Sequence, residues 1–379
     1  MLRQTSKYLF LSCSLVALFF FCMLPAFAEP VKIGAIFALT GKAVNSNRAA
    51  ILGTRLAVRE INEKGGLLGE PIELLVFDNE STPIGSHLAA ERAVKAGVAG
   101  IIGASWSSHS LAVAKVAALH HLPMISPIST IPSLTDIGKS IFRVCYNDDF
   151  QGSALARFAF TDLAARRAVV FIDISSDFSM SIARIFRRTF ESLGGKVVKE
   201  VEYKTGQEDY RPAIREALLH QADVVFLSGY DESGYLAAAL QAAGSTAIPI
   251  GSDGWDAPSF FSSGGNRIVR GYFINHWLPD AIERGSRAFI EKFQGEGDIL
   301  APTALAYDAV HILAAAIEKA GTQDKFKVVD SLRSLRGFKG VTGDISFTPR
   351  GDAAKQACIA EIRAGVPHLL KCVHPDKHE

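Results

Sequence analysis

Short apolar runs rich in β-branched residues alternate with longer amphipathic segments along most of this chain. The run 31–39 (VKIGAIFAL) predicts a buried strand, and 47–64 carries apolar residues at helical spacing until Gly65 and Gly66 end the helix. The alternation continues with strands expected at 73–77, 100–104 and 123–126 and helices at 84–96 and 107–119. Strands and helices that alternate in this way form a parallel sheet with helices on both faces. The pattern therefore predicts an α/β fold.

A second series of the same kind begins after the polar stretch 146–149. Strands are expected at 168–172, 197–203, 222–227 and 249–251, with helices at 179–193, 212–220 and 232–243. Helices at 282–293, 304–320 and 325–335 then precede a β segment at 340–374. Because the chain also exceeds the size of one ordinary core, two doubly wound units are the simplest interpretation.

The N-terminus indicates export. Arg3 and Lys7 precede an apolar run at 8–24 that ends in the small-residue signal Ala26-Phe27-Ala28. This is typical of a secretory leader cleaved after Ala28, and the run is short for a membrane-spanning helix. We expect residues 1–28 to be a signal peptide and the mature protein to be soluble.

The charge balance and the cysteines exclude some classes of protein. Beyond residue 28, 38 Lys and Arg residues face 39 Asp and Glu residues, which argues against a nucleic-acid or anionic-membrane partner. Three cysteines remain there, too few for a disulfide scaffold. Cys358 and Cys372 nevertheless lie symmetrically about an expected turn at 364–365, which predicts a disulfide in an oxidising compartment; two buried thiols are the alternative.

The sequence lacks the common motifs of enzyme catalysis and of metal binding. The sequence has no G-x-S-x-G, P-loop, G-x-G-x-x-G or H-E-x-x-H pattern. We therefore expect neither an enzyme nor a bound cofactor or metal.

Hydroxyl side chains follow two successive strands of the first unit. Ser107 and Ser108 open a helix after 100–104, and Ile128, Ser129 and Thr130 follow 123–126. Such residues often only cap helices, but a helix N-terminus also attracts anions. Because open α/β sheets bind ligands at the carboxyl ends of their strands, these two loops predict a carboxylate site.

Three further candidates follow strands of the second unit. Asp253 comes after 249–251, Tyr230 after 222–227 and Phe178 after 168–172. Taken alone, Asp253 would be interpreted as a turn residue, and Tyr230 and Phe178 as parts of the hydrophobic core. Together at one sheet edge they suggest the wall of a pocket.

The mature chain resembles the leucine/isoleucine/valine-binding protein family, the type I periplasmic substrate-binding proteins of ABC transporters. The resemblance runs nearly end to end and rests on motifs that are weak singly and strong in this order: Val31-Lys-Ile-Gly-Ala with Leu39-Thr-Gly41, 53–66 (GTRLAVREINEKGG), Ile101-Ile-Gly103 with Ser107-Ser108, Met124-Ile-Ser-Pro127 with Thr130, and Gly229-Tyr230.

The resemblance implies two Rossmann-like, doubly wound lobes joined by a hinge of three crossings. The crossings are expected near 146–147, 275–276 and 348–352. The N-terminal lobe would comprise 29–146 and 276–348, and the C-terminal lobe 147–275 and 349–379.

The resemblance also implies roles for the candidate residues. Ser107, Thr130 and the backbone of Ile128 would bind the ligand's α-carboxylate and part of its ammonium group. Asp253 would be the counter-charge of the ammonium, and Tyr230 and Phe178 would close over the side chain. The sequence departs from the family where Ser46 replaces a frequent aromatic lid, Phe178 replaces a usual tyrosine, and Trp106 adds bulk beside Ser107, which leaves the identity of the ligand side chain open.

These implications predict a periplasmic, monomeric binding protein that delivers a hydrophobic L-amino acid to an inner-membrane ABC permease. One alternative is a binder of a carboxylate without an amine, such as an aromatic acid. Another is a ligand-sensing periplasmic protein that acts through a separate receptor.

Overall fold

The computed structural model describes residues 29–279 and 284–375. The expected signal peptide lies outside these residues, so its prediction stays a prediction. Within the described residues, no helix combines the length and the apolar character needed to cross a membrane.

The first sheet is parallel and has five strands in the order β2-β1-β3-β4-β5. Its strands are β1 (Val31–Phe37), β2 (Ile72–Asp78), β3 (Gly100–Gly103), β4 (Met124–Ser126) and β5 (Ile141–Arg143). Nearly every residue of β1, and every residue of β3, β4 and β5, is buried, as expected for a sheet covered on both faces.

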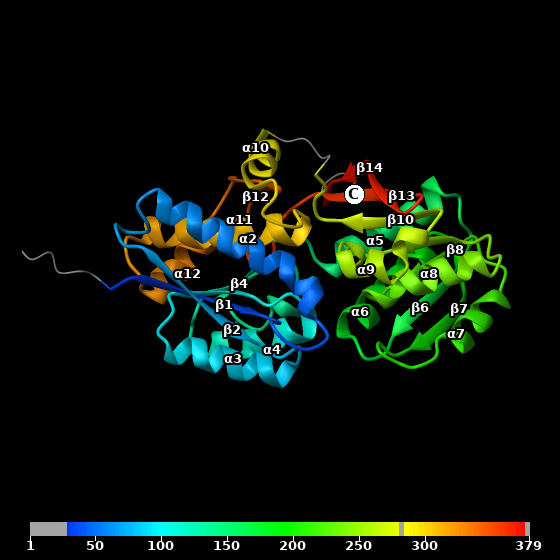
Figure 1. Cartoon of the computed structure of the whole chain (residues 1–379), viewed down its shortest axis with the longest axis horizontal. Coiled ribbons are helices and arrows are strands. Elements are labelled where there is room, and N and C mark those ends of the chain that lie inside the picture. The colour runs from blue at the N-terminus through cyan, green and yellow to red at the C-terminus, as the bar shows by residue number, and fades with distance from the viewer. Residues whose placement is uncertain (1–28, 280–283, 376–379) are drawn as a thin grey trace, which may run out of the picture. The chain divides into compact units, whose positions relative to one another are not determined.

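Helices cover both faces of this first sheet (Figure 1). On one face, α2 (Val44–Glu63) lies along α11 (Ala301–Ala320), with α10 (Arg284–Phe293) and α12 (Lys325–Arg333) beside them. The other face carries α3 (Pro83–Lys95) and α4 (Ser107–Leu119). Gly53 permits the close approach of α2 to α11, because a Cβ there would lie 1.9 Å from the carbonyl oxygen of Thr303.

The second sheet has seven strands in the order β14-β13-β10-β9-β8-β6-β7. Five are parallel: β6 (Arg167–Asp173), β7 (Lys196–Tyr203), β8 (Val224–Leu227), β9 (Ile248–Gly251) and β10 (Arg270–Asn275). The antiparallel strands β13 (Ala357–Arg363) and β14 (Val366–Val373) extend it beyond β10. Helices α5 (Asp148–Arg157), α6 (Asp177–Ser192), α7 (Arg211–Leu218), α8 (Glu232–Ala242) and α9 (Pro258–Ser263) belong to this lobe.

The chain passes between the two sheets three times. It leaves the first sheet after β5, returns to the first lobe after β10, and enters the second sheet again at β13. A small hairpin of β11 (Phe338–Gly340) and β12 (Gly343–Ile345) precedes the third passage. Two doubly wound lobes joined by three crossings are thus confirmed, whereas the predicted lobe boundaries stay a prediction.

Candidate functional site

A small cavity lies where the loops after β1, β3 and β4 meet the loops after β6, β8 and β9. Its volume is about 40 Å³, room for roughly three water molecules. Eight of the nine predicted ligand residues line it: Ser46, Trp106, Ser107, Ile128, Thr130, Phe178, Tyr230 and Asp253. Both sheets therefore present the carboxyl ends of their strands to one site, as expected for doubly wound folds.

The first lobe contributes hydrogen-bond donors. Ser107 is the first residue of α4 and is buried, and the preceding Trp106 provides no side-chain cap for the helix start. Ser105 also lines the cavity, and its buried hydroxyl has no hydrogen-bond partner. The uncapped start of a helix carries unpaired N–H groups and a partial positive charge. This side of the cavity is therefore suited to an anionic group.

Ser129, the ninth predicted residue, does not line the cavity. Its hydroxyl donates to the carbonyl oxygen of Ser105 at 2.8 Å and contacts the hydroxyl of Ser110. Ser129 thus joins the loops after β3 and β4 to each other. The neighbouring Thr130 faces the cavity, and its carbonyl oxygen accepts a hydrogen bond from the backbone N–H of Asp148 at 2.8 Å.

The second lobe contributes a buried carboxylate. Asp253 begins a short 3₁₀ helix after β9 and is 6% exposed. Its Oδ2 lies 3.0 Å from Nε2 of His276, and its backbone N–H donates to Oε1 of Gln151 at 3.1 Å. Its Oδ1 is buried and has no hydrogen-bond partner. A buried carboxylate oxygen without a partner is costly, so this atom marks a place for a donor from outside the chain.

Two further buried aspartates lie close to Asp253. Burial, with the charge of Asp253 as a further cause, raises the pKa of Asp148 to about 7 and the pKa of Asp256 to about 6. The nearby hydroxyls of Thr130 and Ser181 partly oppose the rise in the pKa of Asp148. Carboxyls in such a group resist joint ionisation, and a cation among them would relieve this repulsion.

Aromatic rings from both lobes close one side of the cavity. The rings of Trp106 and Tyr230 are stacked with centroids 4.8 Å apart, and Tyr230 stacks on Phe178 at 5.0 Å. Trp106 comes from the first lobe and the other two from the second. This stack explains why the cavity is so small.

Ser105, Asp148, Gln151, Asp256 and His276 are the residues that the sequence did not reveal as part of the site. Asp256 stands three residues after Asp253, and Asp148 lies in the polar stretch that was interpreted only as a crossing. Gln151 contacts Asp253 across 102 residues of sequence, and His276 contacts it across 23 residues. No local motif signals contacts of that kind.

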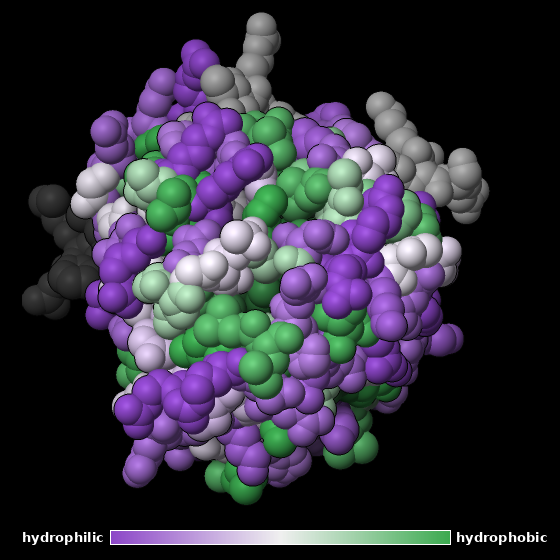
Figure 2. All heavy atoms as spheres, turned by 90° about the vertical axis from the view of Figure 1, so that its right-hand side faces the viewer, coloured by the Kyte–Doolittle hydropathy of each residue, from purple (hydrophilic) through white to green (hydrophobic). Residues whose placement is uncertain are grey.

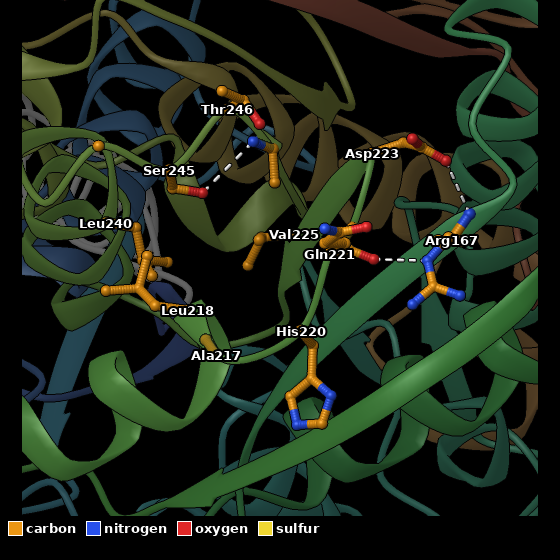
Figure 3. A pocket seen from close by; sticks show the side chains of 13 residues that line it. Arg167, Ala217, Leu218, His220, Gln221, Asp223, Val225, Leu240, Ser245 and Thr246 are labelled. Carbon is orange, nitrogen blue, oxygen red and sulfur yellow. Dashed lines mark hydrogen bonds between the residues drawn. The ribbon is translucent and has the colours of Figure 1, made fainter.

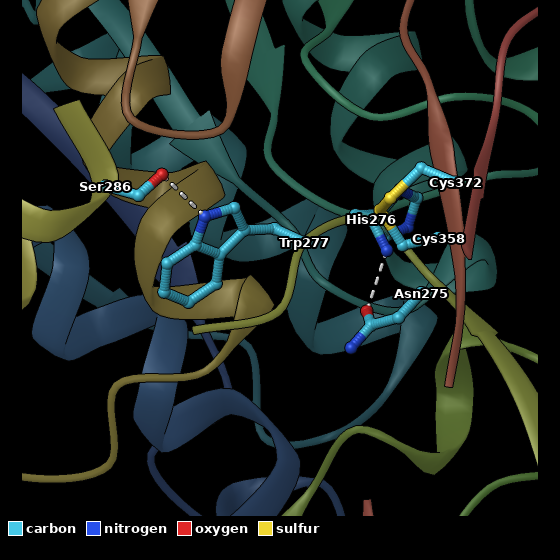
Figure 4. Close-up of a disulfide and its surroundings, with 6 residues drawn as sticks. All are labelled: Asn275, His276, Trp277, Ser286, Cys358 and Cys372. Carbon is cyan, nitrogen blue, oxygen red and sulfur yellow. Dashed lines mark hydrogen bonds between the residues drawn. A yellow bond between two sulfur atoms is a disulfide. The ribbon is translucent and has the colours of Figure 1, made fainter. Parts of the chain in front are cut away.

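A disulfide lies beside the second crossing (Figure 4). Cys358 and Cys372 are bonded and face each other in the β13–β14 ladder, as the predicted pairing requires. Cys358 is also paired with Asn275, the last residue of β10, so the bridge is adjacent to the crossing. After the crossing, Trp277 donates from Nε1 to the hydroxyl of Ser286, which anchors the returning chain (Figure 4).

A larger cavity, about 460 Å³, lies at the opposite, amino edge of the second sheet. Figure 3 shows Arg167 directed toward Gln221 and Asp223 at this place. Its polar groups satisfy one another, because Arg167 Nε donates to the carbonyl oxygen of Gln221 at 2.6 Å and its backbone N–H donates to Asp223 at 2.9 Å. On the face of the second lobe in Figure 2, hydrophobic and hydrophilic residues are interspersed. The smaller cavity, where buried polar atoms lack partners, is therefore the candidate functional site.

The described part of the chain holds no group of three or more His, Cys, Asp or Glu side chains suited to a metal ion.

Comparison with known proteins gives consistent results. A model of the family described as periplasmic binding protein matches residues 30–366. The Leu/Ile/Val-binding protein BraC3 of Rhizobium johnstonii is 29% identical over 354 residues, which cover 92% of this chain and 95% of that protein.

Two solved structures extend the comparison. A leucine-binding protein LivK of Thermotoga maritima is 34% identical with a TM-score of 0.87, covering 91% of this chain and 99% of that one. The branched-chain amino acid binding protein LivJ of Streptococcus pneumoniae, solved with isoleucine, is 26% identical with a TM-score of 0.86, covering 92% of this chain and 100% of that one.

Proposed function

This chain belongs to the periplasmic binding protein family, and from that premise we propose that it is the substrate-binding protein of an ABC transporter, with an L-amino acid as its ligand. The similar proteins named above are described as binding leucine, isoleucine or valine. In this proposal the ligand occupies the cavity between the strand ends of the two lobes.

The observation that carries the proposal is the unpartnered Oδ1 of Asp253, in a cavity that also holds the uncapped start of α4. An α-amino acid has a cationic ammonium and an anionic carboxylate on the same carbon. The helix start and the hydroxyls of Ser107 and Thr130 suit the carboxylate. Asp253 suits the ammonium, with the raised pKa values of Asp148 and Asp256 as further support for a cation at this place.

The rest of the lining favours a hydrophobic ligand side chain. Trp106, Tyr230, Phe178 and Ile128 present mainly carbon surface to the cavity. Burial of apolar ligand surface against such rings is favourable by about 25 cal/mol per Å².

A role in transport implies a location outside the cytoplasm and a membrane permease as partner. We propose that residues 1–28 are cleaved during export to the periplasm and that the loaded protein, as a monomer, docks on an inner-membrane ABC permease. In this role the protein returns its ligand unchanged.

Calorimetry of Asp253→Asn and Asp253→Ala tests the proposal, after a thermal-shift screen has identified the amino acid that binds most tightly. Loss of one partner of a buried ion pair costs about 2–5 kcal/mol, which corresponds to roughly 30-fold to 4000-fold weaker binding. The control is Asp330→Asn, because Asp330 is exposed on α12. Substitutions at such positions stay within about 0.5 kcal/mol.

Two results would contradict the proposal. If both Asp253 variants bind like the parent, Asp253 is not the ammonium anchor. If the parent binds the deaminated acid as tightly as the amino acid, the protein is a binder of carboxylates without an amine.

A further inference from the structure

We propose that His276 is a positioning residue that holds the carboxylate of Asp253 for the ligand's ammonium group and ties this anchor to the crossings between the lobes. The inference rests on the proposed function and adds a residue that does not line the cavity.

His276 lies at the second crossing, directly after β10, and is 1% exposed. Its backbone N–H donates to Oδ1 of Asn275 at 2.7 Å (Figure 4). The ring packs against Tyr146, which precedes the first crossing into α5, with centroids 3.7 Å apart and an angle of 31° between the ring planes. Its position is therefore set by two of the three crossings.

The ring reaches Asp253 through one nitrogen, with Nε2 3.0 Å from Oδ2. An ionised carboxylate only accepts hydrogen bonds, so Nε2 must carry the proton. Burial and the charge of Lys355 lower the pKa of His276, opposed by Asp253. A neutral ring that donates from Nε2 fixes the carboxylate without cancelling its charge. Nδ1 is then an unprotonated nitrogen, and no hydrogen-bond partner of it is found among the described residues.

The two carboxylate oxygens of Asp253 have different surroundings. Oδ2 is held by His276, and Oδ1 remains unpartnered in the cavity lining. Gln151 of α5 accepts from the backbone N–H of Asp253 and so holds the same residue from the first crossing. An ammonium that binds Oδ1 would thus bind a group already connected to both crossings. A charged His276 would instead neutralise Asp253 and weaken the attraction for a cation.

The test compares two substitutions by calorimetry. His276→Phe keeps a planar ring against Tyr146 but removes the donor, whereas His276→Gln keeps an N–H donor. Each variant is titrated with matched pairs of ligands: leucine and 4-methylpentanoate, alanine and propanoate, phenylalanine and 3-phenylpropanoate. The readout is the ratio of the two dissociation constants within the pair whose amino acid the parent binds most tightly.

We expect His276→Phe to weaken binding of the amino acid by about 10-fold to 150-fold, the range expected for loss of a hydrogen bond to a charged group. The deaminated acid should change by less than about 2-fold, so that the selectivity ratio falls. His276→Gln should restore most of the ratio. The control exchange, His311→Phe in α11, should leave it unchanged, because the ring of His311 lies against Tyr307 of the same helix and not against Asp253.

An equal loss for both members of the pair would assign His276 a purely structural role and overturn the inference, as would parent-like binding by His276→Phe. A parent that does not distinguish the amino acid from its deaminated analogue overturns the proposed function itself, and with it this inference. Melting temperatures separate loss of fold from loss of affinity.

Discussion

At the scale of single residues, three buried aspartates in and around one cavity dominate the electrostatics of this protein. Each of two of them has one oxygen without a hydrogen-bond partner among the described residues: Oδ1 of Asp253, whose Oδ2 is held by His276, and Oδ2 of Asp148. Gln151 Nε2 donates to the other oxygen of Asp148 at 3.2 Å. Burial raises the pKa of Asp148 to about 7.

The raised pKa of Asp148 predicts a pH dependence of stability. Its folded-state pKa of about 7 exceeds the ordinary value of 3.8, so the folded state holds more protons between these two values. The stabilisation is complete below pH 3.8 and is lost as the pH rises through about 7. Burial lowers the pKa of His109 and of His311 to about 4, and these two histidines act in the opposite direction below pH 6.5. The prediction is therefore a difference between proteins: the melting temperature of Asp148→Asn relative to that of the parent should rise between about pH 4 and pH 7.

The neighbouring Asp149 provides the control for that measurement. Asp149 is exposed, so Asp149→Asn should show the same dependence of the melting temperature on pH as the parent. The raised pKa of Asp256, about 6, also makes stability fall as the pH rises. Part of the pH dependence of the melting temperature should therefore remain in Asp148→Asn. A slope equal to the parent's in Asp148→Asn would show that Asp148 is ionised in the folded protein.

At the scale of elements, predictions succeeded where a local pattern decides the structure. The hairpin of β13 and β14 turns at Ala364 and Gly365, with φ of +48° and +78°, as the expected turn requires. Elements without such a pattern were missed. β5 has only three residues, and α5 begins with Asp148 and Asp149, the end of the polar stretch 146–149, which shows no apolar periodicity although it forms the acidic first turn of a helix.

The site divides in the same way. Residues that directly follow parallel strands, such as Ser107 and Asp253, were predicted because parallel strands bring their carboxyl ends to one edge. His276 and Gln151 were not, because their contacts with Asp253 depend on how the crossings pack. The orientation of Ser129 toward the loops of its own lobe is likewise a result of packing.

The disulfide gives a prediction about one element, the β13–β14 hairpin. Cys358 and Cys372 are 14 residues apart, and a cross-link that closes a loop of this size stabilises by about 3 kcal/mol. We expect the double variant Cys358→Ala, Cys372→Ala to lose about 2–4 kcal/mol of unfolding free energy in urea denaturation. Mass spectrometry of the unreduced protein should show the two peptides linked.

A reducing agent supplies the control for this experiment. It should destabilise the parent and leave the double variant unchanged, because the remaining cysteine beyond the leader, Cys145, is buried and free among the described residues. Alkylation of both Cys358 and Cys372 after unfolding without reductant would contradict the pairing.

At the scale of the whole molecule, the size of the cavity constrains how a ligand enters. The cavity of about 40 Å³ is closed on one side by the stack of Trp106 on Tyr230, and these two rings belong to different lobes. An amino acid is too large to enter such a space while the stack holds. We expect a ligand to enter when the two lobes separate, with the three crossings as the segments that bend.

Ligand binding should accordingly close the lobes about these crossings. The carboxylate partners lie in the first lobe and Asp253 in the second, so neither lobe alone holds both ends of an amino acid. An open unliganded state in solution should give a larger radius of gyration than the saturated state in small-angle scattering. Asp253→Asn is titrated to saturation in the same way. Its radius of gyration should decrease less than that of the parent, because the second lobe of the variant holds the ligand more weakly. An unchanged radius of gyration at saturation in the parent would mean that the lobes are closed without ligand, and that opening is the brief, ligand-independent step.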